Sequence, residues 1–576
     1  MWERKKSTFL INKYKSLLKV SLAVEGAAFL VTFTDTLLAG NMVGAEALAA
    51  VAMVAPFALI TTFLASMINS GTIVKYAYCV GAYDRKHANK KFSQGLLLAT
   101  IAGVCTLLVF ELGCDFFVSR NAAPDIMRQY LREYFRIQCI YLSLDPVSVL
   151  LDNTILYDGG EKLSAAANVT EIIGNVVLSI IFGRFWGVAG IALASVVSKI
   201  IFLVIICFWF FSKKNTLRFS WYLDLKESAQ VLKRGVVKAS PIVLRALTEF
   251  VMNAYILWRF GLTVFVLWGI AQRFIGIRSF FVGLSQAVSP LVGTLRGENN
   301  TLELRSIMDV SSLVMFIIGG VFSLFTVLFA DLLVRSFGIT DSSTLREAGM
   351  ILRIIGASFL FQALATHLFS YYFMIEKRLL TFLICAIKDF IAPLGLGIAG
   401  AILSENPTGL WIGISLSPLM SLLIILPIIY RRYGRAMFPY LISVERDAQI
   451  FFYDLELTQQ KIVDLSGAVV SLLKGENYSE RTQMLAGVLV EDVLLLTMNA
   501  NHSKSAIHAE CTIFLEDSGV RVILRDSGII QNITHDDADV ISFRQYFVTQ
   551  VMDVIENKFY ITTTGYNRNE YFIKDK

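Results

Sequence analysis

Residues 33–51 read FTDTLLAGNMVGAEALAAV, and they place one carboxylate, Asp35, near the end of an apolar run that begins around Leu17. A helix needs about 20 consecutive apolar residues to cross a bilayer. A carboxylate inside such a run costs about 2.5–3.5 kcal/mol at the bilayer centre and usually marks an ion or substrate path. The stretch therefore predicts a membrane helix with a functional aspartate. A structural role for Asp35, as a helix cap or an ion-pair partner at the outer interface, is the alternative.

The composition of the chain excludes an ordinary soluble protein. Of its 576 residues, 55% are hydrophobic and 17% are charged, and the mean hydropathy is +0.60. Soluble domains carry about 25% charged residues. The seven cysteines are scattered without a C-x-x-C pair, so neither a disulfide framework nor a zinc site is indicated. The net charge of +6 needs no nucleic acid to explain it, because the basic residues lie in short loops.

The apolar runs predict an all-α polytopic membrane protein with twelve transmembrane helices, followed by a C-terminal cytoplasmic α/β sandwich domain. Basic residues concentrate at the N-terminus, after the second span, between the sixth and seventh spans, and after the last span. The positive-inside rule therefore places both termini in the cytoplasm. We expect spans near 17–39, 47–74, 92–117, 131–156, 164–183, 187–211, 237–259, 262–293, 307–330, 348–374, 379–402 and 409–430.

A weak internal repeat divides the membrane part into halves. EALAAVAMVAPF in the second span aligns with the region of LTVFVLWGIAQRF in the eighth, at an offset of about 216 residues. Six spans is an even number, so both halves insert with the same orientation, and a site is expected between or inside them. The predicted units are an N-lobe at 1–220, a C-lobe at 221–440 and a cytoplasmic domain at 441–576.

Three motifs resemble those of the multidrug and toxic compound extrusion (MATE) transporters. The first is Asp35, Gly40, Gly44 and the run Ala47–Ala50. The second and third are GLSQAVSPLVGTLRGENN at 283–300 and GVAGIALASVVSK at 187–199. The resemblance covers residues 10–440. It implies a bacterial plasma-membrane protein of two six-helix lobes that exports cationic or amphipathic organic compounds by cation-driven alternating access.

The resemblance also implies coupling residues in the first lobe. Asp35 matches the family's aspartate of span one, where protons or sodium are thought to act, and Asn175 matches an asparagine of span five. The family often has an aspartate four residues later, where this chain has Ser179. Glu171 lies one turn before Asn175 and could supply a second carboxylate from the same helix face.

In the second lobe, Pro241 and Glu249 match a proline and a glutamate that some members hold in span seven. The aspartate that those members have in span ten is missing, and Gln362 and His367 are the polar residues found there. A buried histidine of this kind is more often a satisfied polar contact than a proton relay. His367 and, in span seven, Arg245 are nevertheless candidates for the substrate cavity.

Further charges fall inside the expected spans. Arg245 and Glu249 are spaced i, i+4, so we expect them to pair across one turn, for structure or for function. Lys388 and Asp389 are adjacent, so we expect them to point in different directions and each to need its own partner.

Asp145 precedes Pro146, so it either contributes to a substrate cavity or satisfies backbone groups freed by a kink. A carboxylate held away from water can exchange a proton near neutral pH. Sodium could instead be held by Asp35, Asn175 and backbone oxygens, because hard cations prefer oxygen ligands. The sequence leaves both ions open and indicates no other cofactor.

After Tyr440 the apolar runs shorten and alternating patterns such as CTIFLED and VRVILRDSG appear. A tail of this length is enough for one α/β domain. We expect helices at 445–475, 480–500 and near 542–556, and strands at about 509–516, 519–526 and 558–574.

The tail resembles the GHKL-type ATP-binding fold in VEDVLLLTMNANH at 490–502, RDSG at 525–528 and the segment 542–573. The resemblance implies that Asp526 and Gly528 would recognise adenine and that Glu491 would be the general base. Leu495 stands where the family has a magnesium-binding asparagine. The site is therefore interpreted as degenerate, without ATP hydrolysis, and a partner-docking module is an equal alternative.

The leading hypothesis is a secondary active exporter of small organic molecules, without enzymatic activity. One alternative is a membrane-anchored sensor that acts through its tail on a cytoplasmic protein partner. Another is a lipid-linked flippase of the wider superfamily, which would require a basic cleft for phosphate. The basic residues available for such a cleft are Arg245, Arg273, Arg278 and Lys388.

Overall fold

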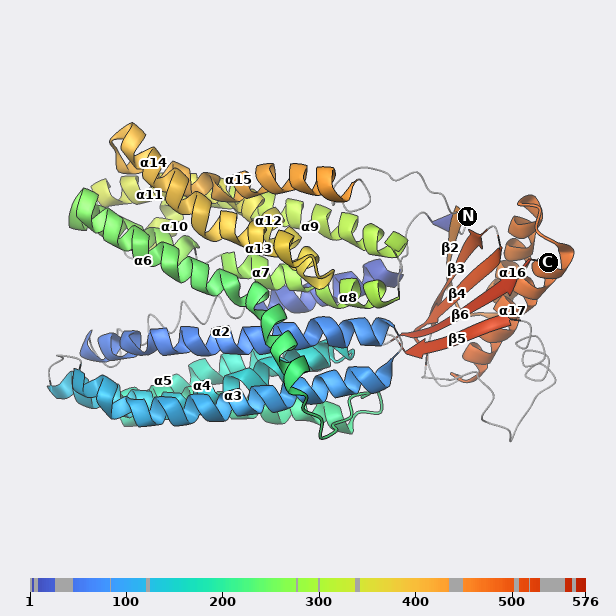
Figure 1. The fold of residues 1–576 in the computed structure, drawn as a ribbon, viewed down its shortest axis with the longest axis horizontal. Coiled ribbons are helices and arrows are strands. Elements are labelled where there is room, and N and C mark those ends of the chain that lie inside the picture. The colour runs from blue at the N-terminus through green and yellow to red at the C-terminus, as the bar shows by residue number, and fades with distance from the viewer. Residues whose placement is uncertain are drawn as a thin grey trace.

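The computed structural model contains a long helical bundle and a small α/β domain at one end of it (Figure 1). The residues that it describes are 3–4, 9–25, 45–82, 84–120, 125–275, 278–298, 301–336, 342–434, 449–501, 507–516, 518–528, 555–561 and 566–575. We refer to residues 449–575 as the tail domain, and to the side of the bundle that it contacts as the tail end.

The bundle helices form two groups along the chain (Figure 1). The first helix group consists of α2 (Ala45–Gly81), α3 (Arg85–Arg120), α4 (Asp125–Tyr157), α5 (Glu161–Cys207) and the short η1 (Phe208–Phe211). The second helix group consists of α6 (Leu225–Ile275), α7 (Arg278–Gln286), α8 (Ser289–Gly297), α9 (Thr301–Leu328), α10 (Ala330–Ser336), α11 (Ser342–Ala357), α12 (Phe359–Met374), α13 (Arg378–Ala386), the π-helical turn η2 (Ile387–Ile391), α14 (Ala392–Ser404) and α15 (Pro407–Tyr433).

Predicted spans two to five, seven and twelve each lie within one helix. Span six runs from α5 into η1, and span nine ends at the first residue of α10. Spans eight, ten and eleven are each divided among two or three elements, namely α6, α7 and α8, then α11 and α12, then α13, η2 and α14. Within the described ranges, seven helices are long and apolar enough to cross a membrane, or eight if the bent α11–α12 pair is one span. The long α5 and α6 are each interrupted by one glycine in a left-handed conformation, Gly187 with φ 56° and Gly261 with φ 78°. Gly187 is the first residue of predicted span six, and Gly261 falls between predicted spans seven and eight.

Hydrogen bonds across these glycines show that the chain turns back on itself. Asn175 donates to the Ser195 hydroxyl at 3.1 Å, across Gly187. The Trp268 indole donates to the Asn253 side chain at 2.7 Å, across Gly261. Glycine has no Cβ to clash at positive φ, so it permits these tight connections.

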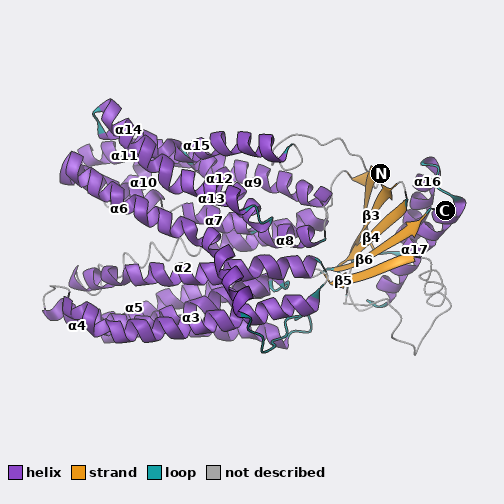
Figure 2. Cartoon of the chain, in the orientation of Figure 1, coloured by secondary structure: helices purple, strands orange, loops and turns teal. Residues whose placement is uncertain are grey.

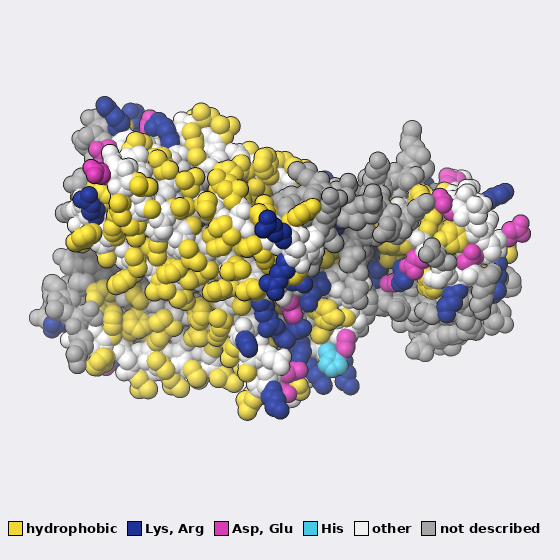
Figure 3. All heavy atoms as spheres, turned by 45° about the horizontal axis from the view of Figure 1, so that its top comes forward, with side chains coloured by type: hydrophobic (Ala, Val, Ile, Leu, Met, Phe, Trp, Pro, Cys, Tyr) yellow, Lys and Arg dark blue, Asp and Glu magenta, His cyan; other side chains and the backbone are white. Residues whose placement is uncertain are grey.

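Apolar side chains form a belt across the face of the bundle seen in Figure 3. Large exposed hydrophobic residues include Leu112, Phe116, Phe250 and Leu403. Lys and Arg side chains gather where the belt meets the tail domain (Figure 3). An exposed apolar belt bounded by charge is the surface that a bilayer covers, so the chain is a multi-pass membrane protein.

The two helix groups are in close contact near the tail end. A Cβ on Gly81 of α2 would lie 2.1 Å from the Thr294 carbonyl oxygen of α8, so the helix backbones touch there. Ion pairs also cross between the groups, from Lys75 to Glu376 at 3.2 Å and from Lys91 to Glu227 at 2.6 Å.

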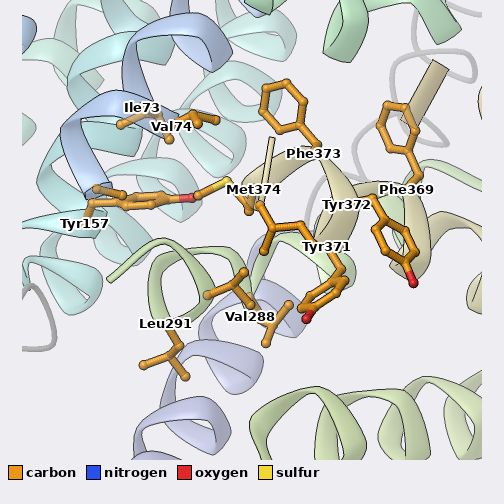
Figure 4. Close-up of a cluster of buried hydrophobic side chains, with 14 of the residues drawn as sticks. Ile73, Val74, Tyr157, Val288, Leu291, Phe369, Tyr371, Tyr372, Phe373 and Met374 are labelled. Atoms are coloured by element: carbon orange, nitrogen blue, oxygen red, sulfur yellow. The ribbon is translucent and has the colours of Figure 1, made fainter. Parts of the chain in front are cut away.

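Figure 4 shows the apolar cluster that fills this contact. We call it the tail-end plug, and it includes Ile73 and Val74 from α2, Tyr157 from α4, Val288 and Leu291 at α8, and Phe369, Tyr371, Tyr372, Phe373 and Met374 from α12. The Tyr157 hydroxyl lies 3.9 Å from the Met374 sulfur, which joins the two groups directly. Both helix groups therefore contribute to one closed core at the tail end.

The tail domain is an antiparallel sheet with two helices on one face (Figure 2). The strand order is β1-β2-β3-β4-β6-β5. The elements are β1 (Glu3–Arg4), β2 (Gln449–Glu456), α16 (Gln459–Gly475), α17 (Glu480–Asn499), β3 (His508–Glu516), β4 (Gly519–Asp526), β5 (Ile555–Ile561) and β6 (Asn567–Lys574). The strand β1 from the start of the chain extends this sheet.

The structure of the tail domain confirms some of the predicted helices and strands and corrects others. The helix expected at 480–500 and the strands at 509–516 and 519–526 are present within a residue. The helix expected at 445–475 is wrong in its first part, because 449–456 pairs with β3 as a strand. The strand expected at 558–574 is two strands, β5 and β6. The helix expected near 542–556 lies almost wholly outside the described residues, and its last two positions belong to β5.

Alternation along the strands divides the sheet into two buried faces. Side chains such as Cys511, Val522 and Tyr571 pack with α16 and α17. The residues next to them point to the opposite face, as the period of two requires. There Arg525 donates to Glu303 of α9 at 2.6 Å and to Glu510 at 3.1 Å.

Arg568 lies opposite Arg525 on the neighbouring strand and is 3.7 Å from Glu298, at the end of α8. All of these groups are nearly inaccessible to water. Burial opposes the charge of Arg525, yet the carboxylates of Glu303, Glu510 and Glu298 raise the pKa of Arg525 above its ordinary value. We call this group the tail latch. It joins the face of the sheet opposite α16 and α17 to the bundle.

Candidate transport cavity

A cavity of about 250 Å³ lies between the two helix groups. One wall comes from α2 and α4 of the first group. The other comes from α6, α7, α12 and η2 of the second group. Its lining includes Thr62, Ser66, Asn69, Asp145, Val149, Asn153, Lys238, Pro241, Ile242, Arg245, Val282, Gln286, Phe369, Lys388 and Asp389. The tail-end plug shares Phe369 with this lining.

Three of the helices are locally irregular at or next to the residues that line the cavity. Pro146 lies inside α4 and Pro241 lies inside α6, and an interior proline removes one backbone hydrogen bond. The third irregularity is the π-helical turn η2, a type of turn frequent at functional sites. The Asp389 carbonyl in this turn accepts a hydrogen bond from the Thr248 hydroxyl at 2.7 Å. The irregular turns allow polar groups to face the cavity.

The wall of the second helix group carries a shared carboxylate. The Lys388 ammonium lies 2.7 Å from both oxygens of Asp389, and the Arg245 guanidinium lies 3.2 Å from one of them. The expectation that Lys388 and Asp389 need separate partners is therefore wrong. The wider π turn permits adjacent residues to pair. Arg245 thus pairs with Asp389 across the two helices, and its i, i+4 pairing with Glu249 stays a prediction.

The first helix group holds the opposite arrangement, one cation between two carboxylates. The buried Lys199 of α5 lies 2.7 Å from Glu171 and 3.6 Å from Asp145. Its ammonium also lies 5.0 Å from the centre of the Tyr141 ring. Glu171 and Asp145 are thus joined through Lys199, which sequence reasoning missed. A lysine in the middle of predicted span six was the available signal.

The other residues predicted for the site do not line the cavity in the described part of the chain. Asp35 lies outside the described residues. Asn175 bonds to Ser195 and Ser179 behind the cavity wall. Glu249 is exposed on α6, one turn beyond Arg245 on the same helix face. His367, a candidate for the cavity, is buried outside its lining, and its Nε2 lies 3.0 Å from the Ser311 hydroxyl.

Two more intramembrane charges were missed by sequence reasoning. Lys238 of α6 lines the cavity, and its ammonium lies 3.1 Å from the Ser370 hydroxyl and 4.9 Å from the Phe369 ring centre. Glu25, near the end of the helix at 9–25, packs against Gly283 of α7, where an added Cβ would meet its carboxylate at 1.8 Å. Both residues lie inside predicted spans, which was the signal available.

The tail residues that were compared with a nucleotide site lie at the end of β4 and on α17, and they include no magnesium ligand at position 495. Asp526 ends β4 and accepts hydrogen bonds from the Gly528 amide at 2.9 Å and from the Asn567 side chain at 2.8 Å. Glu491 is half-buried on α17. Leu495 is buried in the apolar core of the domain, where it cannot coordinate magnesium. Within the described ranges, no group of three His, Cys, Asp or Glu side chains is placed to hold a metal ion.

Comparisons with known proteins agree with this architecture. A crystal structure of MATE in complex with MaL6 superposes with a TM-score of 0.68 at 18% identity, covering 74% of this chain and 96% of that one. An outward-facing multidrug resistance MATE family transporter of the MOP superfamily gives 0.68 at 18%, covering 75% and 99%.

A MOP superfamily transporter from Pyrococcus furiosus Vc1 gives a TM-score of 0.67 at 18% identity, covering 75% of this chain and 99% of that one. Its description states that the reverse polarity of its binding pocket suggests a different function. At this identity the similarity establishes the fold alone. No curated protein matches the chain.

The family comparison gives the stronger result. The model of the MatE family matches residues 23–181 and 262–394, which is about half of the chain and covers parts of both helix groups. The matched segments include the carboxylate-bearing wall of the first group and the Lys388–Asp389 turn of the second. The chain therefore belongs to the MatE family of membrane transporters.

Proposed function

We propose that the protein is a secondary active exporter that uses a gradient of protons or sodium to move amphipathic organic compounds out of the cell by alternating access. The observation that carries this proposal is the cavity between the helix groups, lined by ionisable residues from both. Ionisable residues inside membrane segments usually mark ion or substrate paths. Transport of this kind requires no covalent chemistry.

The positive-inside pattern supports a plasma-membrane location with the tail in the cytoplasm, where the Lys and Arg side chains gather (Figure 3). In that orientation the tail-end plug closes the cytoplasmic side. The described conformation then corresponds to the state that releases substrate outside. Opening requires the plug to separate and the Lys75–Glu376 ion pair to break.

The proposed coupling residues are Asp35, Glu171, Asn175 and Glu249. The geometry around Lys199 supports a role for Glu171, because an arriving proton or sodium ion would compete with the lysine ammonium for the same carboxylate. If the ion favours one access state and the substrate favours the other, the gradient shifts the population between them.

Amphipathic substrates fit the mixed lining, in which Ile242, Val282 and Phe369 lie beside charged groups. A permanent cation would lie next to three basic side chains, so we propose the amphipathic alternative rather than the cationic one. Arg245 is the proposed contact at the polar end of the substrate, and Asp145 stays a candidate residue of the cavity wall.

The test is transport by the purified full-length protein in liposomes, with proton and sodium gradients imposed separately. Asp35→Asn and Glu171→Gln are compared with wild type. We expect transport across the liposome membrane to follow one gradient and to vanish in Asp35→Asn while folding is retained. Normal coupled transport by Asp35→Asn would contradict the assignment of that residue.

One other function has a specific observation in its favour. A lipid-linked flippase requires a basic cleft for phosphate, and Arg245 and Lys388 do line the cavity. The side chains of Arg273 and Arg278 lie outside the described part. A lipid substrate is therefore included as a separate arm of the experiment below.

A further inference from the structure

The charges that line the cavity are segregated between its two walls. The second helix group contributes three cations, Lys238, Arg245 and Lys388, and a single lining carboxylate, Asp389. The first helix group contributes Asp145, which is already engaged by Lys199 behind it. The wall of the second group therefore faces the cavity with a surplus of positive charge.

Asp389 does not neutralise this wall by itself. It is shared between the Lys388 ammonium and the Arg245 guanidinium, and its side chain is fully inaccessible to water. Among the described residues, no carboxylate lies within 4 Å of the Lys238 ammonium, whose contacts are the Ser370 hydroxyl and the faces of Phe369 and Phe373. A cation held away from bulk water without a counter-charge is unfavourable, so an anion brought by a ligand would be stabilised here.

The rest of the lining is suited to an apolar body. Pro241 and Ile242 lie one helical turn from Lys238 and Arg245, and Val282 and Phe369 line the cavity as well. A volume of about 250 Å³ lies just below the ~300 Å³ at which typical ligand pockets begin. The site therefore has room for a small ring system next to an anionic group.

We propose that the transported substrate carries an anionic group, a carboxylate, phosphate or sulfonate, which Lys238 and Arg245 bind while its apolar part contacts Ile242 and Phe369. This inference rests on the proposed export function and names the substrate class. The same chemistry is offered by a soluble amphipathic acid and by the headgroup of an anionic lipid. An arginine fork and a lysine point charge are both common partners of such oxyanions.

The experiment uses liposomes containing the full-length protein and three probes. Two are fluorescent two-ring molecules of opposite charge, 2-naphthalenesulfonate and N-methylquinolinium. The third is a phosphatidylglycerol with a fluorescent acyl chain, whose movement between leaflets is read by dithionite quenching. Each probe is tested under the ion gradient that drives transport, and with wild type, Lys238→Gln, Lys238→Arg and Lys233→Gln. Lys233 is exposed on the same helix and does not line the cavity, so it serves as the matched control.

We expect gradient-driven transport of 2-naphthalenesulfonate and none of N-methylquinolinium. Lys238→Gln should lower anion transport at least about tenfold, while Lys238→Arg and Lys233→Gln should retain it, because a lost charge partner in a desolvated site is costly. Movement of the lipid alone, with the same dependence on Lys238, would support the anionic class and identify a lipid source.

Three outcomes would count against the inference, and they are distinguishable. Transport of N-methylquinolinium without either anion would reverse the substrate charge and leave the export function standing. Transport of none of the three probes by well-folded protein would count against the export function itself. Equal anion transport by Lys238→Gln and wild type would exclude Lys238 as the binding cation.

Discussion

Asp389 has more charged neighbours than any single carboxylate can neutralise. Its side chain is inaccessible to water, and Lys388 and Arg245 both lie within 3.2 Å. Removing one partner from a buried ionic group is far more costly than removing the group as a whole, because uncompensated charge remains. The residue is thus needed to hold two cations at the cavity wall.

Replacing Asp389 with leucine should destabilise the protein by about 3–5 kcal/mol, since two cations lose their counter-charge. The matched control is Asp331→Leu, because Asp331 pairs with Arg353 at 2.8 Å but both side chains are more than 40% exposed. Exposed pairs contribute only about 0–1 kcal/mol. Thermal unfolding in one detergent compares the two variants, and equal shifts would contradict the buried role of Asp389.

The Lys75–Glu376 pair predicts a pH dependence for closure at the tail end. Burial opposes the charge of Glu376, but Lys75 and Arg296 outweigh it and lower the pKa of this carboxyl. A carboxyl with a lowered pKa stabilises the folded contact above its unfolded pKa, about 4.3, and this contribution is lost as the pH falls through the lowered value.

Closure at the tail end should therefore be constant between pH 8 and 5 and weaken only in stronger acid. Hydrogen exchange of α2 and α12 as a function of pH measures it, with Glu376→Gln as the reference without the charge. A loss of protection already at pH 6 would show that another group controls closure.

At the scale of elements, the approach of α2 to α8 controls contact between the helix groups. Gly81 has no side chain, and this lets the two helix backbones touch. Packed cores have two discrete arrangements rather than a continuous range, so a small obstacle at such a contact can shift the balance between states.

Gly81→Ala should hold the helix groups apart at the tail end, because its Cβ would lie 2.1 Å from the Thr294 carbonyl oxygen. Gly320→Ala is the control, since nothing lies within 4 Å of a Cβ there. Spin labels at the exposed positions 86 and 432, in a background without other reactive cysteines, should report a longer distance only for Gly81→Ala. An unchanged distance would mean that this contact does not limit closure.

The elements also show which local features a sequence can predict. The predicted breaks between spans five and six and between seven and eight lie next to Gly187 and at Gly261, because glycine at positive φ is a local requirement. The π turn at 387–391 was not predicted, since an extra backbone residue in a turn has no compositional signal. Consequently the pairing of Lys388 with Asp389 was predicted wrongly.

At the scale of the whole molecule, the tail domain is attached to the bundle by buried charge. Arg525 contacts Glu303 of the bundle and Glu510 of its own sheet, and all three are nearly inaccessible to water. The helix at 9–25 adds a second connection, because the Phe9 amide donates to Glu510 at 3.3 Å and Lys13 pairs with Glu161 at 2.7 Å. The tail therefore contacts the segments that lead into both helix groups.

Arg525→Ala should release the tail domain from the bundle, since Glu303 and Glu510 would be left buried without their cation. Arg481→Ala, at an exposed position of α17, is the control. Hydrogen exchange should rise in β3, β4 and residues 9–25 of the first variant only. Unchanged exchange in Arg525→Ala would show that the apolar contacts suffice to hold the tail in place.

The sequence by itself determined the membrane class, the breaks near Gly187 and Gly261, and the family. Each depends on runs or motifs within about 20 neighbouring residues, where length and glycine spacing act locally. The alternating patterns of the tail also predicted two of its strands, β3 and β4.

Only the tertiary structure decided which charges are partners. Arg245 and Asp389 are 144 residues apart, and Arg525 and Glu303 are 222 apart. A buried charge requires a counter-charge but does not specify where along the chain it lies, so the polarity of the cavity and the docking of the tail emerge only when the helices and strands are packed.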